Sequence, residues 1–247
     1  MEAELRSARE LLRNARQVCV LTGAGMSAES GVPTFRDAQT GLWANFDPMQ
    51  LASEEGFRAN PSLVWDWYAS RRDKMRAVQP NAGHVALARF AKQHPGRVGI
   101  VTQNVDDLHQ RAGSEGVIRL HGDILQDTWL ERGRCTPSCD MARAVPGSPP
   151  RCAACGNLVR PGVVWFGEML PADALAQAES LAERCDVMLV VGTSGSVYPA
   201  AGLAHRARRA GAKVMIVNPE PSEIDDEAHV LLRGTAAHLL PALLDMN

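Results

Sequence analysis

The stretch LTGAGMSAESGVPTFRD, which runs from Leu21 to Asp37, decides the fold. It continues the apolar run VCVLT, which is typical of a buried strand, and then turns at Gly23 and Gly25. A short helix is expected to begin near Ser27 and to end early, because a glycine and a proline follow. Backbone N–H groups in such a turn favour a phosphate. The third glycine of the common dinucleotide fingerprint is missing, so a tight turn without a ligand is the alternative.

Short runs rich in valine and isoleucine recur along the chain and are typical of strands buried on both faces. Stretches with helical periodicity separate them. Strand alternating with helix predicts an α/β fold with a Rossmann-like, doubly wound parallel sheet. The strands are expected at 18–22, 97–102, 117–122, 186–193 and 213–218, and the helices at 82–93, 172–185 and 199–211.

Two regions depart from this alternation. One contains the tryptophan-rich stretch LVWDWYASRRDKM and is expected to be a helical insertion, and the other is rich in cysteine, proline, glycine and arginine. We therefore expect a large domain built on the sheet and a smaller domain with two modules. The large domain comprises 1–37, 82–126 and 159–247, and the small domain comprises a helical module at 38–81 and a cysteine-rich module at 127–158.

Four of the six cysteines are clustered, with C-x3-C followed after twelve residues by C-x2-C. Thiolates bind zinc tetrahedrally, and two such pairs supply four ligands with no open position, which indicates a structural rather than a catalytic metal. Loss of the metal or a redox pair is the alternative. Cys19 and Cys185 lie in or beside apolar runs and are expected to be inert. The predicted zinc ligands are Cys135, Cys139, Cys152 and Cys155.

Polar side chains follow the other strands, at the edge of an open parallel sheet where ligands bind. TQNVDDLHQRAG brings Gln103, Asn104 and Asp106 to this edge, although capping of the next helix is the alternative. His121 in LHGD follows the next strand, where a neutral imidazole can act as a base and a structural histidine is the alternative. In RPGVVWFGEML, VVWF reads either as a core strand or as an edge to which an extended peptide adds.

Taken together and in this order, these elements resemble the sirtuin family of NAD-dependent protein lysine deacylases. The resemblance spans GAGMSAESGVPTFRD, TQNVDDLHQRAG, LHGD, the cysteine pairs, RPGVVWFGE and GTSGSVYPA. It implies a Rossmann-like large domain and a small domain made of a zinc ribbon and a helical insertion. NAD is then a co-substrate: the acyl oxygen attacks C1′ of the nicotinamide ribose, and the products are free lysine, nicotinamide and O-acyl-ADP-ribose.

The resemblance also implies roles for the matching positions. His121 is the implied general base, and Asn104 and Asp106 complete the implied catalytic set. The implied peptide contacts are Val163, Val164, Phe166 and Gly167, within a strand from Val163 to Glu168. The implied NAD contacts are Gly23, Ala24, Gly25, Ser27, Phe35, Arg36, Trp43, Gln103, Asn104, Asp106, Gly192, Thr193, Ser194, Asn218 and Ala236.

The acyl preference is suggested by Tyr68 and Arg71, which lie three residues apart on a predicted helix and share a face. They match the Tyr-x-x-Arg pair of the sirtuin subgroup that removes succinyl and malonyl groups. A guanidinium can bind a distal carboxylate bidentately, and a phenol adds one hydrogen bond. A surface arginine beside a packed tyrosine is the alternative. Two departures from the family pattern are the C-x3-C spacing and Asp123 after HG, where serine is common.

Two other functions remain open at this point, mono-ADP-ribosyl transfer and non-catalytic NAD sensing. A net charge of −2 over 247 residues disfavours nucleic acid as the main ligand. No apolar run approaches the ~20 residues of a membrane span, and the amphipathic start lacks a signal-peptide core. We therefore expect a cytoplasmic monomer whose partners are acyl-lysine peptides and proteins.

Overall fold

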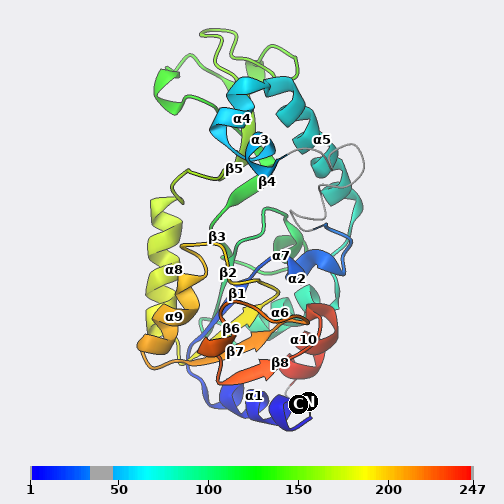
Figure 1. Cartoon of the computed structure of the whole chain (residues 1–247), viewed down its shortest axis with the longest axis vertical. Coiled ribbons are helices and arrows are strands. Elements are labelled where there is room, and N and C mark those ends of the chain that lie inside the picture. Colours follow the sequence, from blue (N-terminus) through cyan, green and yellow to red (C-terminus); the bar gives the residue numbers. More distant parts are fainter. Residues whose placement is uncertain (1, 34–46, 246–247) are drawn as a thin grey trace.

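A computed structural model describes residues 2–33 and 47–245 of the chain. Its centre is a six-stranded parallel sheet with the order β3-β2-β1-β6-β7-β8 (Figure 1). The chain builds outward from β1 to β3 and then returns to β6 on the other side of β1, so the strand order reverses between β1 and β6. The strands are β1 Val18–Thr22, β2 Val98–Thr102, β3 Ile118–Arg119, β6 Val187–Val191, β7 Lys213–Val217 and β8 Val230–Leu232.

Helices cover both faces of this sheet, which confirms the predicted α/β class. Successive residues of β1 point to opposite faces, as the pleat requires. Val18 and Val20 therefore join one hydrophobic cluster, whereas Cys19 and Leu21 join the other. The first cluster packs against α1 Glu2–Asn14, α6 Ala82–Gln93 and α10 Ala236–Leu244, and the second packs against α8 Ala172–Arg184 and α9 Gly202–Arg209.

A smaller part of the molecule lies at the end away from both termini (Figure 1). Three helices there pack against an antiparallel pair of strands, and Phe57, Trp67, Ile124 and Trp165 form the centre of their common core. The elements are α3 Pro48–Leu51, α4 Glu54–Ala59, α5 Pro61–Ala77, β4 Gly122–Trp129 and β5 Val159–Val163, with the 3₁₀ turns η2 Arg132–Arg134 and η3 Met141–Arg143 between the two strands.

Several predicted boundaries differ from the observed ones. The helix expected near Ser27 is the single turn α2 Gly25–Ala28, because the chain already turns at Gly23, whose carbonyl accepts the N–H of Met26 at 2.9 Å. The strand expected at 117–122 is shortened to β3. Gly122 has a φ of 81°, which turns the chain out of the parallel sheet and into β4.

The segment Val163 to Glu168 is not one strand, because β5 ends at Val163. The carboxylate of Glu168 folds back and accepts the backbone N–H of Trp165 at 2.8 Å, and Gly167 has a φ of 84°. Phe166 forms an isolated parallel bridge with Ser53 outside the named strands. The remaining elements are α7 Leu108–Arg111 and the 3₁₀ turn η4 Asp225–Glu227.

Among the described residues, no helix is both long enough and apolar enough to cross a bilayer.

Candidate active site

The glycine turn after β1 packs against the turn after β6. The N–H of Gly23 donates to the carbonyl of Val191 at 2.9 Å, and the N–H of Gly25 donates to that of Gly192 at 2.8 Å. A Cβ on Gly25 would lie 2.7 Å from the Cα of Gly192, so a side chain would push the two turns apart. Both turns lie where the strand order reverses, which is the usual ligand crevice of a doubly wound sheet. The two turns expected to hold NAD therefore form one continuous backbone surface.

A buried hydrogen-bonded chain lies beside this surface. The amide of Asn104 donates to Ser27 Oγ at 3.1 Å, and this hydroxyl donates to Asp106 Oδ2 at 2.9 Å. The other oxygen of Asp106 accepts the N–H of Leu108, the first residue of α7, at 3.0 Å, although the N-cap residue of this helix is Asp107. Burial raises the pKa of Asp106, and these hydrogen bonds partly oppose the shift. The structure thus brings together Ser27, Asn104 and Asp106, which are three of the predicted site residues. Asp106 also holds the start of α7 in place.

His121 lies between β3 and β4, with its Nδ1 2.9 Å from the carbonyl oxygen of Gln103. A carbonyl only accepts hydrogen bonds, so Nδ1 carries the hydrogen and Nε2 keeps its lone pair. Burial lowers the pKa of His121, and the bond to Gln103 only partly offsets this. The side chain of Gln103 donates to Thr193 Oγ1 at 3.2 Å, so Gln103 connects His121 to the turn after β6. The arrangement provides a neutral imidazole with a defined basic nitrogen.

The predicted peptide-binding residues begin next to His121. The N–H of Val164 donates to the backbone carbonyl of His121 at 2.9 Å, and the N–H of Phe166 donates to that of Ala52 at 2.9 Å. Phe166 is 46% exposed and Met169 is 92% exposed, so apolar surface is open to a partner there. This segment therefore links His121 to the turn between α3 and α4.

Tyr68 and Arg71 lie on α5, in the part of the molecule that packs against this segment. The phenol of Tyr68 is buried and accepts a hydrogen bond from the indole Nε1 of Trp165 at 3.0 Å. The Arg71 guanidinium lies 4.8 Å from the centre of the Trp67 ring. Burial raises the pKa of Tyr68 to about 12, against the attraction of Arg71, and burial lowers the pKa of Arg71. At neutral pH the pair is a neutral phenol beside a cation.

The neighbouring Arg72 has a different role. Its guanidinium donates to the carbonyl of Ile124 at 2.6 Å and binds Asp127 at 2.6 Å, so it fastens α5 to β4. Asp123, which departs from the family pattern, is held by Arg119 at 2.8 Å. These two ion pairs belong to the framework of the site.

Other predicted NAD contacts lie at the same edge of the sheet or just beyond it. Asn218 follows β7, and its amide donates to the carbonyl of Glu220 at 2.8 Å. Ser194 Oγ lies 2.7 Å from Ser196 Oγ, and Ala236 is the buried first residue of α10. The remaining predictions Phe35, Arg36 and Trp43 lie outside the described residues.

The cysteine cluster fits a structural zinc ion. The sulfurs of Cys135, Cys139 and Cys155 lie within 4.8 Å of one another, and the buried Cys152 thiol contacts the last two. The separation of 3.6 Å between the sulfurs of Cys139 and Cys155 is close to the ~3.8 Å that two thiolates of a tetrahedral zinc would have at ~2.3 Å from the metal. The backbone N–H of Thr136 lowers the pKa of Cys139 to about 7, which favours the metal-binding thiolate. The wider C-x3-C pair thus joins the same cluster as the C-x2-C pair.

Removing one thiol of this cluster should release the metal. We expect Cys155→Ala to contain little zinc by elemental analysis and to melt about 10 °C lower, because ~3 kcal/mol shifts the melting temperature of a chain of this size by about that much. The matched control is Cys185→Ala, which removes a buried thiol beside the central sheet. A Cys155→Ala protein with a full zinc content would contradict the assignment.

Two buried histidines beneath the site were missed by sequence reasoning. His84 Nε2 lies 3.4 Å from Ser27 Oγ, and His109 Nε2 lies 3.0 Å from Thr22 Oγ1. Their rings meet edge to face with centroids 4.9 Å apart. His84 is the third residue of α6, where it completes a capping box with Asn81. Its place among the apolar residues of this helix was the signal that could have indicated a buried histidine.

These histidines predict a loss of stability in acid. Burial lowers the pKa of His84 to about 4 and that of His109 to about 3, and His84 and Arg119 add to the latter shift. As the pH falls below ~6.5, these histidines become protonated in the unfolded chain. In the folded chain they stay neutral until the pH reaches their lowered pKa values, so the free energy of unfolding falls between ~6.5 and those values. At pH 5 each histidine contributes a loss of about 2 kcal/mol.

We expect the drop in the free energy of unfolding between pH 7 and pH 5, measured with urea, to be smaller by about 2 kcal/mol in His109→Gln than in the wild type. His238→Gln is the control, because that side chain is exposed. An unchanged drop in His109→Gln would show that His109 is protonated in the folded protein at pH 5.

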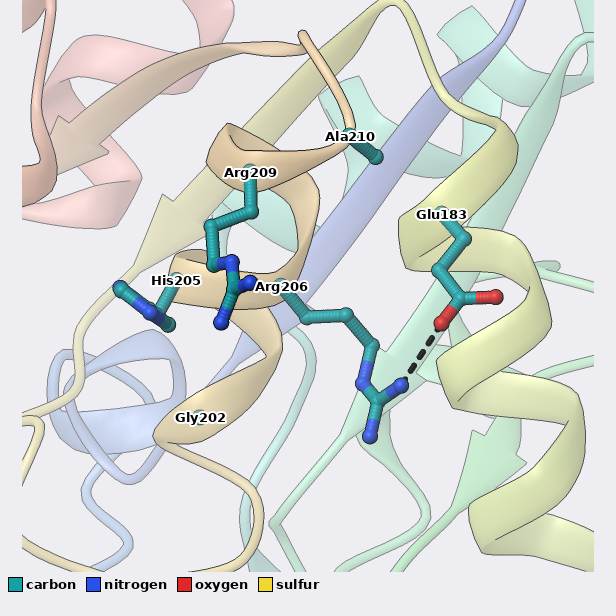
Figure 2. A pocket seen from close by; sticks show the side chains of 6 residues that line it. All are labelled: Glu183, Gly202, His205, Arg206, Arg209 and Ala210. Carbon is teal, nitrogen blue, oxygen red and sulfur yellow. Dashed lines mark hydrogen bonds and ion pairs between the residues drawn. The ribbon is translucent and has the colours of Figure 1, made fainter.

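A surface depression of about 600 Å³ lies elsewhere, between α8 and α9 (Figure 2). Two of its side chains already have acidic partners: Arg206 binds both Glu179 and Glu183, and His205 binds Glu227. None of the predicted site residues lines it. The depression is therefore separate from the candidate site at the edge of the sheet.

Comparisons with known proteins show what the chain is similar to. Residues 23–199 match the model of the Sir2 family. An NAD-dependent protein deacylase of Ralstonia nicotianae is 56% identical over 96% of this chain and 94% of its own length. NAD-dependent protein deacylase 2 of Pyrobaculum aerophilum is 47% identical, over 96% of this chain and 93% of its own length.

Solved structures extend the likeness to the fold. A Sir2 homologue in complex with NAD is 42% identical, with a TM-score of 0.83 over 99% of this chain and 92% of the other. Sir2 bound to an acetylated peptide is 32% identical, with a TM-score of 0.82 over 96% of this chain and 95% of the other.

Proposed function

The chain belongs to the Sir2 family and is an NAD-dependent protein deacylase, and we propose that it removes succinyl and malonyl groups from lysine side chains in addition to acetyl groups. The observation that carries the proposal is the pair Tyr68 and Arg71. A cation and a neutral phenol beside the peptide-binding segment suit an acyl group that ends in a carboxylate. A neutral acetyl group has no carboxylate that the charge of Arg71 or the phenol of Tyr68 could bind.

The energetics of Arg71 support this reading. A guanidinium that loses water on burial is stabilised by an anion, and its planar fork matches a carboxylate. Tyr68 keeps its hydrogen at neutral pH because burial raises its pKa to about 12, so the phenol can donate to the same carboxylate. The pair therefore offers charge from one residue and direction from the other.

We further propose that the residues at the sheet edge divide the work on NAD. The turns at Gly23 and Gly192 bind the phosphates, with Ala24, Gly25, Thr193 and Ser194. His121 Nε2 accepts the proton of a ribose hydroxyl, while the chain from Asn104 through Ser27 to Asp106 holds the ribose and the nicotinamide in place. NAD supplies the ribose carbon to which the acyl oxygen bonds as nicotinamide leaves. Gln103, Asn218 and Ala236 complete the proposed contacts.

The proposed peptide contacts are the backbone groups of Val163, Val164, Phe166 and Gly167. Pairing through the main chain tolerates many side chains, so the enzyme should accept many target proteins. We propose that NAD and the acyl-lysine meet in a cleft between a large domain of residues 1–37, 82–126 and 159–247 and a small domain of residues 38–81 and 127–158. β4 and β5, whose side chains pack against the helices of the small domain, lie at the junction of the two.

The test uses three peptides of one sequence that carry acetyl-, succinyl- or malonyl-lysine, each incubated with NAD and the wild-type protein. Mass spectrometry should show the loss of all three acyl masses. Loss of acetyl alone would reject the proposed acyl range, whereas a gain of ADP-ribose on the peptide would favour mono-ADP-ribosyl transfer. Binding of NAD without any product would favour a sensor.

A further inference from the structure

We propose that Trp165 is a positioning residue for acyl selection, because its indole N–H fixes the direction in which the phenol of Tyr68 donates. This inference rests on the proposed removal of acyl groups that end in a carboxylate. It adds a residue to the site that neither binds NAD nor touches the acyl carboxylate itself.

The contact between the two side chains carries the inference. Trp165 Nε1 lies 3.0 Å from the hydroxyl oxygen of Tyr68, and both residues are buried. An indole nitrogen can only donate, so the phenol oxygen accepts this bond. The hydrogen of the phenol is then directed away from the indole and stays available to an acceptor. The hydrogen of the Tyr68 hydroxyl can rotate about the C–O bond. The indole N–H excludes the rotational positions in which this hydrogen would point toward the indole.

The ring of Trp165 is itself held on several sides. The guanidinium carbon of Arg160 lies 3.4 Å from the ring centre, and the ring of Phe57 lies 5.2 Å away at an angle of 38°. The backbone N–H of Trp165 donates to the carboxylate of Glu168, which also accepts from Arg160 at 2.9 Å. A donor held in this way can restrict a hydroxyl more firmly than a mobile side chain could.

The bond also changes the strength of the phenol as a donor. A hydrogen bond accepted by the oxygen draws electron density from it and strengthens the bond that its own hydrogen makes. The pKa of Tyr68 agrees with this, since the bond from Trp165 lowers it against the larger effect of burial. Phenylalanine at position 165 would keep most of the apolar contact and remove this donor.

The experiment compares Trp165→Phe with the wild type on acetyl- and succinyl-lysine peptides. We expect KM for the succinyl peptide to rise about fivefold, since one hydrogen bond contributes about 1 kcal/mol, with kcat within about twofold of the wild type. Both constants for the acetyl peptide should stay within about twofold of the wild type. A loss of packing alone would instead impair the reactions of both peptides. In a Tyr68→Phe background, Trp165→Phe should cause no further rise. Trp129→Phe, on β4, is the matched control for a tryptophan replaced in the small domain.

A second measurement does not depend on activity. The chain has only two tyrosines, so labelling the tyrosine Cζ with ¹³C gives two NMR signals, and Tyr198→Phe identifies the one from Tyr68. Trp165→Phe should move the Tyr68 signal, and the succinyl peptide should move the wild-type signal while the acetyl peptide leaves it in place.

The outcomes separate this inference from the proposed function. If the wild type removes succinyl groups but Trp165→Phe weakens both activities equally, or leaves the Tyr68 signal unmoved, the role of Trp165 is overturned and the proposed function stands. If the wild type removes no succinyl or malonyl group, the proposed acyl range fails and the inference fails with it.

Discussion

Replacement of His121 with alanine is expected to lower kcat/KM by about 10²- to 10⁴-fold for acetyl and succinyl peptides alike, the range over which positioned bases contribute. The structure assigns the basic lone pair to Nε2, because Nδ1 is used by the carbonyl of Gln103. The loss should be independent of the acyl group, because the proposed role of His121 is to act on the ribose. NAD binding, measured by calorimetry, should change little.

The control for this variant is His205→Ala, which removes an exposed histidine on α9 that binds Glu227. It should retain full activity. A His121→Ala protein with half of the wild-type activity would remove the imidazole from the mechanism. A protein that no longer binds NAD would instead show that His121 holds the co-substrate.

The pH dependence of the wild type follows from the same imidazole. The base works only when it is neutral, and it is neutral above its pKa. Burial lowers the pKa of His121 below the usual value, so activity should persist as the pH falls through ~6.5 and decline only below it. The profile of kcat/KM thus provides a direct check on the sign of this shift.

The central sheet could be predicted because its strands are buried on both faces. β1, β6 and β7 are runs of apolar residues that need no alternation to be recognised, and the polar residues that end them mark one edge of the sheet. The position of Gly23, Gln103 and His121 at that edge followed from this rule alone. A correct prediction of the sheet therefore also predicted where the candidate site residues lie.

The elements that were missed lack such a pattern. β4 has the sequence GDILQDTW, in which only Ile124 is buried, and β8 has three residues. α10 contains Pro241 in its interior, which argues against a helix in a single sequence. The antiparallel pair of β4 and β5 depends on residues that are far apart in the chain, so no local periodicity of apolar residues indicates it.

Contacts between distant side chains were also beyond the sequence. Trp165 and Tyr68 are 97 residues apart, and their hydrogen bond is formed only when α5 packs against the segment after β5. His84 and His109 meet for the same reason, because α6 and α7 pack together. Residue types and spacing identified which groups can do the chemistry, whereas the supporting contacts required the packed structure.

Replacement of Arg71 with methionine is expected to separate the two acyl preferences. A charge-assisted pair of hydrogen bonds contributes about 1.5–3 kcal/mol, and a carboxylate left in a partly buried pocket without a cation costs more, so kcat/KM for the succinyl peptide should fall about 100-fold. The acetyl peptide carries no such charge, and its kcat/KM should stay within about threefold. Methionine preserves most of the length of the arginine stem, although the guanidinium that lies over the Trp67 ring is lost.

Two further variants sharpen the result. Arg71→Lys keeps the charge but loses the planar fork, so it should restore only part of the succinyl activity. Arg76→Met is the matched control, because Arg76 is exposed on the same helix and pairs with Asp73. Equal losses of acetyl and succinyl activity in Arg71→Met would mean that Arg71 supports the pocket as a whole. Selective loss would instead establish that the guanidinium recognises the distal carboxylate, since no other term in the reaction distinguishes the two peptides by charge.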